Sequence, residues 1–215
     1  LLPTGRNFYG IDPRNLPTPA AWEIGKTLGD QVIERYISEE GRYPESVGIV
    51  LWSGANMRSH GQCVAEFLYL LGVRPQWQHG SQRVIGLEVI PLMELKRPRI
   101  DVTARISGLF RDTMPSVMNL LDKAVLLVGE LEEDEEQNYV RKHLLVDSLE
   151  LEAEGLTKED AWRQAAFRIF GDEQGVYGAG VAALLEAKNW ESIDDIAEVY
   201  VRWGAHAYGG KVKGK

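Results

Sequence analysis

The chain has 215 residues, with 24 Lys and Arg against 32 Asp and Glu, and therefore carries a formal net charge of −8. This acidic balance argues against a surface for nucleic acid or anionic membranes. A single cysteine, Cys63, excludes an internal disulfide and a cysteine-cluster metal site, and it fits a reducing compartment. No apolar run reaches the ~18 residues of a membrane-spanning helix. The composition predicts a soluble, cytoplasmic protein with no nucleic-acid or membrane partner.

The opening segment, residues 1–19, is dense in proline and glycine and predicts an ordered loop with tight turns. Thr18 followed by Pro19 predicts the start of a helix, and Gly41 predicts its end. The chain begins at Leu1 without a methionine and enters this loop at once. We therefore expect it to be a piece of a longer protein.

Short apolar segments dominate the chain up to about residue 115. The continuous run at 47–52 predicts a strand buried on both faces. A helix ending at Gly72 follows, and then come predicted strands at 73–77, 84–90 and 100–106. Strand, loop, helix and strand in this order predict a βαβ unit. The fold class expected for this half is α/β, a mostly parallel sheet of short strands with flanking helices.

From Ser116 onward the pattern is helical. Further helical stretches are predicted at 137–154, 157–170, 178–188 and 192–205. The sequence therefore divides into an α/β segment at 1–115, an all-helical segment at 116–208, and a flexible tail or cut loop at 209–215. We interpret the acidic run at 130–136 as a solvated face, with a docking surface as the alternative.

The sequence lacks the motifs of several common kinds of binding site. No Walker loop is present and no dinucleotide fingerprint follows the strand ending at Trp52, so we expect no nucleotide to bind here. The four histidines are scattered without i, i+3 or i+4 pairs, and we predict no protein-built metal site. His60 and Cys63 could form a soft ligand pair, although a helix-terminal histidine beside a buried thiol is the favoured interpretation.

Polar loops follow two of the predicted strands. Residues 52–58 carry Trp52 and Arg58, and residues 106–112 carry Arg111. Because ligands of α/β sheets bind beyond the carboxyl ends of the strands, we expect the two loops to line one cleft. The opening loop could add further side chains there, namely Arg6, Asn7, Tyr9 and Asp12.

The arginines of these loops favour one class of ligand. Guanidinium groups bind carboxylates with two parallel hydrogen bonds, so Arg6, Arg58 and Arg111 suit a flat, aromatic, polyacidic molecule. The alternative is that Arg58 and Arg111 make structural pairs within their loops, for example Arg111 with Asp112.

Blocks of sequence along the whole chain resemble one known family in the same order. They are LPTGRNFYGIDPR (2–14), PTPAAWEIG (17–25), NMRSHG (56–61), LYLLGVRP (68–75), RPRIDVTARISGLFRD (97–112), NYVRKH (138–143), RIFG (168–171), VYGAGV (176–181) and WGAHAYG (203–209). These blocks resemble the large subunit of cobaltochelatase and, less closely, the porphyrin-binding large subunit of magnesium chelatase.

The resemblance implies a metal chelatase, a ligase that forms nitrogen–metal bonds by inserting Co²⁺ into a corrin ring in cobalamin biosynthesis. It also implies that separate AAA+ partner subunits hydrolyse ATP, which agrees with the missing phosphate loop. The metal ion, Co²⁺ or in the other branch Mg²⁺, is a substrate. This segment would form part of the tetrapyrrole-binding cleft, with the substrate-binding residues Arg6, Asn7, Tyr9, Trp52, Arg58 and Arg111.

Chelation requires the loss of two ring N–H protons, and a nearby base lowers that barrier. The residues in the matching blocks that can accept a proton are Asp12, Asp112 and His60.

The chain departs from the family pattern in two ways, and both bear on the activity expected of it. Gln62 and Cys63 stand where the family usually has acidic residues after the glycine. The histidine-rich and acidic motifs that we associate with the metal and ring site are also missing, so we expect an internal fragment that is inactive alone. The alternatives are a segment of a magnesium or nickel chelatase, or a scaffold that docks the AAA+ subunits through its acidic helical half without touching the ring.

Overall fold

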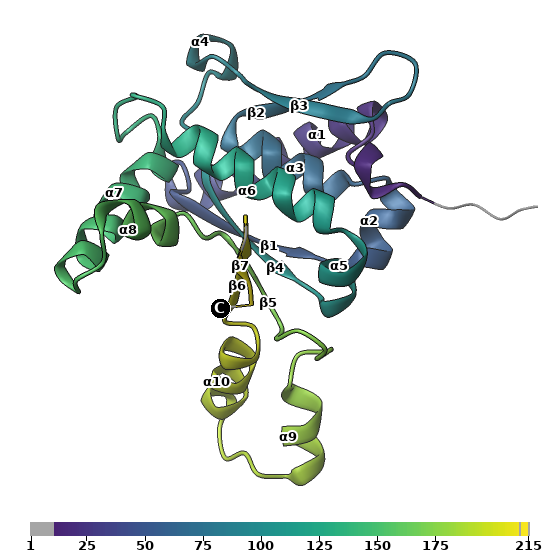
Figure 1. Ribbon diagram of the computed structural model, residues 1–215, viewed down its shortest axis with the longest axis vertical. Helices are drawn as coiled ribbons and strands as arrows, with labels where there is room; N and C mark the ends of the chain where they lie inside the picture. Colours follow the sequence, from purple (N-terminus) through teal and green to yellow (C-terminus); the bar gives the residue numbers. More distant parts are fainter. Residues whose placement is uncertain (1–10, 211, 215) are drawn as a thin grey trace, which may run out of the picture.

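The computed structural model describes residues 11–210 and 212–214 and has a sheet flanked by helices (Figure 1). The five-stranded sheet has the order β1-β4-β5-β6-β7, in which the β1–β4 and β4–β5 pairs are parallel and the last two pairs are antiparallel. Its strands are β1 (Ser46–Leu51), β4 (Asp101–Ile106), β5 (Ile169–Gly171), β6 (His206–Gly209) and β7 (Val212–Lys213). A separate antiparallel pair consists of β2 (Val73–Trp77) and β3 (Val84–Val89).

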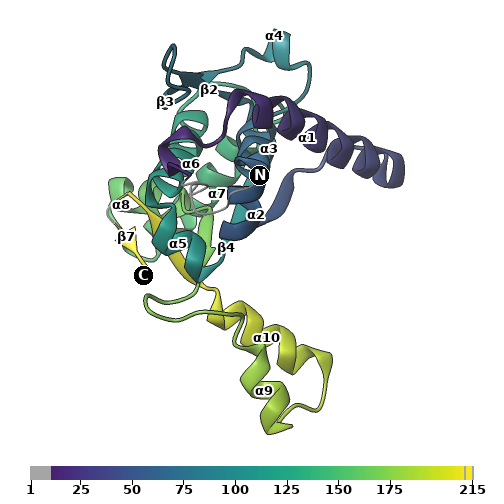
Figure 2. The same cartoon turned by 90° about the vertical axis from the view of Figure 1, so that its right-hand side faces the viewer.

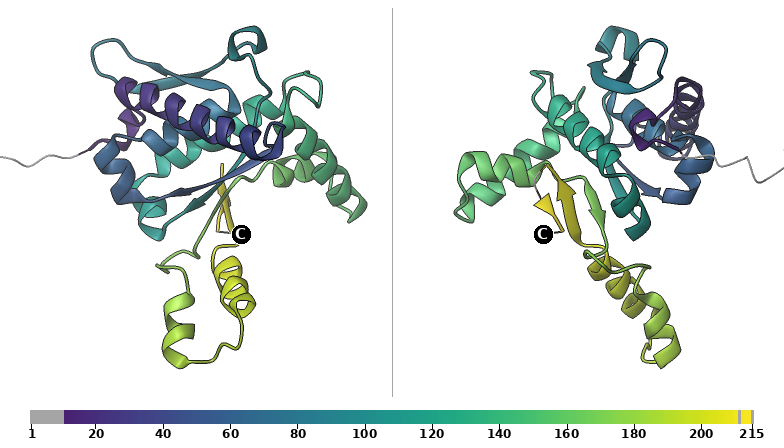
Figure 3. Two further views of the ribbon diagram at one scale, coloured as in Figure 1. Left: turned by 180° about the vertical axis from the view of Figure 1, so that it is seen from behind. Right: turned by 45° about the vertical axis from the view of Figure 1, so that its right-hand side comes forward.

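Helices cover the sheet and extend beyond it. They are α1 (Pro19–Glu40), α2 (Ser53–Ser59), α3 (Gln62–Leu71), α4 (Leu92–Leu95), α5 (Gly108–Thr113), α6 (Pro115–Gly129), α7 (Tyr139–Ala153), α8 (Lys158–Ala165), α9 (Val181–Ala187) and α10 (Ile193–Trp203), preceded by the 3-10 turn η2 (Pro13–Asn15). The central helices α3 and α6 pack beside each other on the sheet, and α1 lies over α3 (Figure 3). Within the described residues, every helix is too short or too polar to span a bilayer.

The helix boundaries predicted in the first half are confirmed. Thr18 caps α1, since its side-chain oxygen accepts a hydrogen bond from the amide of Ala21, and Gly41 ends the helix in the left-handed region at φ 71°. Helix α3 ends at Gly72 in the same way, at φ 77°. These positions are set by short-range chemistry, which is why a single sequence suffices to find them.

The α/β class and the parallel pairing are confirmed, but two details of the first half are wrong. Strand β1 is at the edge of the sheet and has one buried face, so Val50 is 45% exposed where burial on both faces was expected. The strand at 73–77 was expected to continue the parallel sheet, yet it pairs with β3 in its own antiparallel hairpin. The parallel neighbour of β1 is β4, which comes later in the chain.

The second half is mainly helical but not all-helical. The helix predicted at 157–170 ends at Ala165, and residues 169–171 form β5, because Ile169 is buried against Ala104 of β4. Strands β6 and β7 complete the sheet, so the sheet joins residues from both sides of position 115. Where a tail was expected at 209–215, Val212 pairs with Gly209.

Helices α9 and α10 form a hairpin that projects from the rest of the chain (Figure 2). Neither helix contains a buried residue. The hairpin begins after a glycine-rich loop and returns to the sheet at β6, so its base lies at the sheet while its tip lies away from it.

Helix α1 approaches α3 most closely at Gly25, which makes this glycine a site for testing the packing. A Cβ atom on Gly25 would lie 2.4 Å from the Cβ of Ala65 and 2.7 Å from the backbone nitrogen of Glu66. We expect Gly25→Ala to lower the free energy of unfolding by about 1–2 kcal/mol, because overpacking outweighs the gain in helix propensity. Urea denaturation measures this change.

Gly54 provides the matched control for that substitution. It also lies in a helix, but nothing approaches its Cβ position within 4 Å. Gly54→Ala is expected to raise stability by about 0.5 kcal/mol through helix propensity alone. Equal effects of the two substitutions would contradict the close packing of α1 on α3.

Candidate functional site

The carboxyl ends of β1 and β4 meet at one edge of the sheet, as predicted from their order. Leu51 and Ile106 are partners in the register, and the amide of Ser107 donates to the carbonyl of Leu51 at 3.2 Å. Each strand leads directly into a short helix, α2 after β1 and α5 after β4 (Figure 1). The hydroxyls of Ser53 and Thr113 lie 2.9 Å apart and join these helices. We call this region the carboxyl edge.

A third segment, residues 172–180 after β5, reaches the same edge and is fastened there by Arg111. The Nη1 atom of Arg111 donates to the carbonyl oxygens of Asp172, Glu173 and Val176, at 3.2, 2.5 and 3.3 Å. Its Nε and Nη2 atoms donate to the carboxylate of Asp112 at 2.7 and 3.1 Å. The side chain is 5% exposed.

The alternative pairing of Arg111 with Asp112 is therefore present in the structure. All three guanidinium nitrogens of Arg111 already bind groups of this chain, so the geometry favours a positioning role over direct binding of a ring carboxylate. The hydroxyl of Tyr177 donates to Asp112 at 2.6 Å and fastens the loop a second time. The Arg111 guanidinium and this hydroxyl hold the pKa of the Asp112 carboxyl below its usual range, which makes it a weak base.

Asp172 is the functional candidate that sequence reasoning missed. It follows β5 and is 2% exposed, and its Oδ1 accepts a hydrogen bond from Nη2 of Arg105 at 2.9 Å. Burial raises the pKa of the Asp172 carboxyl, although Arg105 and Arg111 act in the opposite direction. Residues 157–170 were predicted as one helix, which hid the fact that Asp172 follows a strand. The strand β5 has only three residues, too few to give a periodic signal.

The other predicted residues occupy different surroundings. Trp52 lies between β1 and α2 with 57% of its surface exposed, and Arg58 is exposed near the end of α2. His60 is exposed in the left-handed region at φ 55°, and its carbonyl accepts a hydrogen bond from the amide of Thr18. Residues 12–18 of the opening loop therefore lie beside the end of α2.

Asp12 caps η2 and is bound by its near neighbour Arg14. Nε and Nη2 of Arg14 donate to the two carboxylate oxygens at 2.9 and 2.8 Å, and this pairing lowers the pKa of Asp12 to about 2. Asp12 is thus a weak base at neutral pH. Arg6, Asn7 and Tyr9 lie outside the described residues, so their predicted part in the cleft stays a prediction.

The comparisons with known proteins agree over the full chain. A family model described as CobN/Magnesium Chelatase matches residues 1–215. The chain belongs to the CobN/magnesium chelatase family. The aerobic cobaltochelatase subunit CobN of a Sinorhizobium species is 47% identical over 215 residues, which are 100% of this chain and 17% of that protein.

Two further relatives of the family show its two branches and its fold. The chloroplastic magnesium-chelatase subunit ChlH of Oryza sativa subsp. indica is 38% identical over 209 residues, 97% of this chain and 14% of that protein. The solved structure of the catalytic subunit of cobaltochelatase from Mycobacterium tuberculosis superimposes with a TM-score of 0.90 at 47% identity, covering 98% of this chain and 17% of that one. This chain therefore spans less than a fifth of the length of the relatives it matches.

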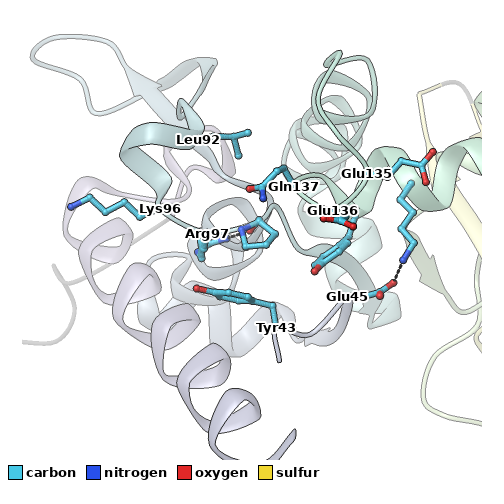
Figure 4. A pocket seen from close by; sticks show the side chains of 11 residues that line it. Tyr43, Glu45, Leu92, Lys96, Arg97, Glu135, Glu136 and Gln137 are labelled. Atoms are coloured by element: carbon cyan, nitrogen blue, oxygen red, sulfur yellow. Dashed lines mark hydrogen bonds and ion pairs between the residues drawn. The ribbon is translucent and has the colours of Figure 1, made fainter. Parts of the chain in front are cut away.

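A cavity lies at the opposite end of the sheet, where the parallel strands begin (Figure 4). It has a volume of about 870 Å³ and includes Glu45, just before β1, and Pro98, shortly before β4. Two of its cations are bound within the chain: Arg97 donates to the carbonyls of Tyr69 and Leu70, and Lys142 lies 2.6 Å from Glu45, whereas Lys96 is exposed. The side chains predicted for the cleft follow the carboxyl ends of β1 and β4, so the carboxyl edge is taken as the candidate site.

The surroundings of Cys63 favour the interpretation of a buried thiol over a metal ligand. Cys63 is half-buried on α3, and burial raises the pKa of its thiol, which disfavours the thiolate that binds metals. Over residues 11–210 and 212–214, no group of three or more His, Cys, Asp and Glu side chains is placed to hold a metal ion.

Proposed function

We propose that this chain is a segment of the large subunit of an ATP-dependent cobaltochelatase, which inserts Co²⁺ into a corrin ring in cobalamin biosynthesis. Its carboxyl edge forms part of the tetrapyrrole-binding cleft, and AAA+ partner subunits hydrolyse the ATP. The observation that carries this proposal is the 47% identity to a cobaltochelatase subunit over the whole chain, against 38% to a magnesium-chelatase subunit.

The geometry of the carboxyl edge supports a role in ring binding. Trp52 offers an exposed indole on which a flat macrocycle can stack, and aromatic contacts of this kind contribute about 0.5–1.5 kcal/mol beyond burial. Arg58 is exposed on the adjoining helix and can pair with an acidic ring substituent. The segment supplies one wall of the cleft, and we expect residues 1–215 alone to insert no metal.

The test is a titration of the full-length subunit with metal-free corrin, followed by absorption. Arg58→Ala is expected to weaken binding by ~1–3 kcal/mol, because it removes a charge-assisted hydrogen bond to a ring carboxylate. Arg35→Ala, on the exposed face of α1, is the matched control and leaves the affinity unchanged. Unchanged affinity in Arg58→Ala would remove this residue from the cleft.

The same titration separates the branches of the family. Tighter binding of a metal-free porphyrin than of the corrin would favour a magnesium-chelatase segment. The scaffold alternative predicts that substitutions at Trp52 and Arg58 leave ring binding intact while those in the acidic run weaken binding of the ATPase subunits.

A further inference from the structure

One carboxylate at the carboxyl edge has a buried oxygen without a hydrogen-bond partner among the described residues. Oδ1 of Asp172 pairs with Arg105, but its buried Oδ2 has no hydrogen-bond partner among the described residues. Buried polar atoms are paired in more than about 90% of cases, and leaving one unpaired is unfavourable. A carboxylate oxygen of this kind can accept a hydrogen bond from a donor that enters from outside.

The entrance for such a donor is a small cavity of about 60 Å³ between Asp172 and the surface. Trp52 and Tyr200 line it together with Arg105 and Ser107. The cavity has room for a few water molecules and none for a macrocycle. A flat ring can lie against the indole of Trp52, which is 57% exposed, and reach Asp172 only through water.

Arg105 holds the carboxylate of Asp172 in place from the side. Its guanidinium lies over the ring of Tyr200, with 5.0 Å from Cζ to the ring centroid, and a Cβ atom on Gly204 would overlap it. The guanidinium of Arg105 therefore packs between Tyr200 of α10 and Gly204, which precedes β6. It binds Asp172 through Oδ1. The remaining oxygen keeps its acceptor capacity.

The other carboxylates predicted as bases are less suited to the task. Asp12 and Asp112 are each bound at both carboxylate oxygens by an arginine side chain, and both pKa values are lowered. Asp172 differs in both respects. Its Oδ2 is unpaired among the described residues, and burial raises the pKa of the carboxyl, although Arg105, Arg111, His206 and the backbone amide of Gly108 all act to lower it. A base with a raised pKa retains an abstracted proton more readily.

We propose that Asp172 is a proton acceptor for metal insertion and takes one of the two ring N–H protons through water in this cavity. The inference rests on the proposed function. The ring N–H bond breaks as a water molecule takes that proton and passes one of its own to Oδ2, forming the O–H bond of a neutral carboxylic acid. The nitrogen keeps the electron pair and donates it to the incoming divalent metal ion, and the carboxylic acid then returns the proton to solvent.

The experiment measures metal insertion by the full-length subunit with its partner subunits as a function of pH. Asp172→Asn is expected to slow insertion by ~10²–10⁴-fold. It should also abolish the acid limb of the pH profile, since that limb reports the ionisation of Asp172. Corrin affinity should change less than threefold, because the side chain does not touch the ring.

Asp122 supplies the matched control for the loss of a buried ion pair. It is 4% exposed and accepts hydrogen bonds from Nη2 of Arg163 at both carboxylate oxygens, beside Gly209 at the other end of β6. Asp122→Asn is expected to lower stability while retaining the acid limb. A rate of Asp172→Asn that equals the wild-type rate, or falls equally at every pH with the acid limb intact, overturns the inference.

A second variant guards against misfolding of Asp172→Asn. Asp172→Ala enlarges the cavity, and added formate is expected to restore insertion in proportion to its concentration, with no such rescue in Asp122→Ala. Absence of rescue in a folded Asp172→Ala subunit that still binds corrin counts against the proton transfer. Failure of the wild-type subunit to bind any tetrapyrrole would instead refute the proposed function itself.

Discussion

Arg99→Met is expected to lower the free energy of unfolding by about 3–5 kcal/mol, the range for breaking a buried ion pair on one side. The Arg99 side chain is fully buried, and its Nε and Nη2 atoms lie 2.7 and 2.9 Å from the carboxylate of Glu133. Its Nη1 also donates to the carbonyl of Gly72 at 2.9 Å, where α3 ends. Methionine fills the space but supplies none of these hydrogen bonds. Guanidinium chloride denaturation measures the loss.

Arg35→Met is the control for that substitution. Arg35 also pairs with a glutamate, Glu39 at 3.0 Å, but the two side chains are 80% and 57% exposed, and such pairs contribute about 0–1 kcal/mol. A loss at Arg99 no larger than the loss at Arg35 would mean that the Arg99–Glu133 pair does not hold α3 to the loop before α7.

Glu133 shows a limit of predicting surfaces from charge runs. It lies within residues 130–136, the run interpreted as a solvated face, and most of that run is exposed. Glu133 turns inward because Arg99 and the side-chain amide of Asn138 both donate to it. Its partner Arg99 is 34 residues away in the chain, so no local pattern distinguishes Glu133 from its exposed neighbours.

The fold was predictable where neighbours in sequence decide it. Helix ends at Thr18, Gly41 and Gly72 follow from capping and left-handed backbone geometry, which a single sequence carries. Strand β5 was not, because three residues give no periodicity and their pairing with β4 joins positions more than 60 apart. Strand β2 was assigned to the wrong sheet for the same reason: the residue pattern of a strand indicates that it is a strand but not which strand it pairs with.

The candidate site was predictable to the level of its loops. Two strands in parallel must bring Trp52 and Ser107 to one edge, and they do. The partners of Arg111 were not predictable in the same way, because they are backbone carbonyls of a loop that begins 61 residues later. Asp172 belongs to that loop, so the error on β5 concealed the carboxylate with the most distinctive surroundings at the edge.

Arg111→Lys is expected to loosen the loop at 172–180 and to lower the free energy of unfolding by about 2–4 kcal/mol, since buried hydrogen bonds to a charged group are lost. A lysine keeps the positive charge, but one ammonium group cannot reach both the Asp112 carboxylate and the carbonyls of Asp172 and Val176, which the guanidinium binds together. Amide hydrogen exchange over residues 173–180 should therefore accelerate, and the rest of the chain should change less.

The same variant separates positioning from direct binding of a ring carboxylate. If Arg111 pairs with the ring, Arg111→Lys keeps most of the corrin affinity through its charge and leaves exchange in the loop unchanged. If Arg111 positions the loop, as its 5% exposure indicates, exchange accelerates and insertion slows through Asp172, while affinity changes little. Arg58→Lys is the control, because that exposed side chain holds no loop and its substitution should alter affinity alone. The two arginines have equivalent places in the sequence pattern, but only Arg111 is buried among carbonyl groups. We therefore expect substitution of Arg111 to change amide exchange and the insertion rate, and substitution of Arg58 to change the corrin affinity.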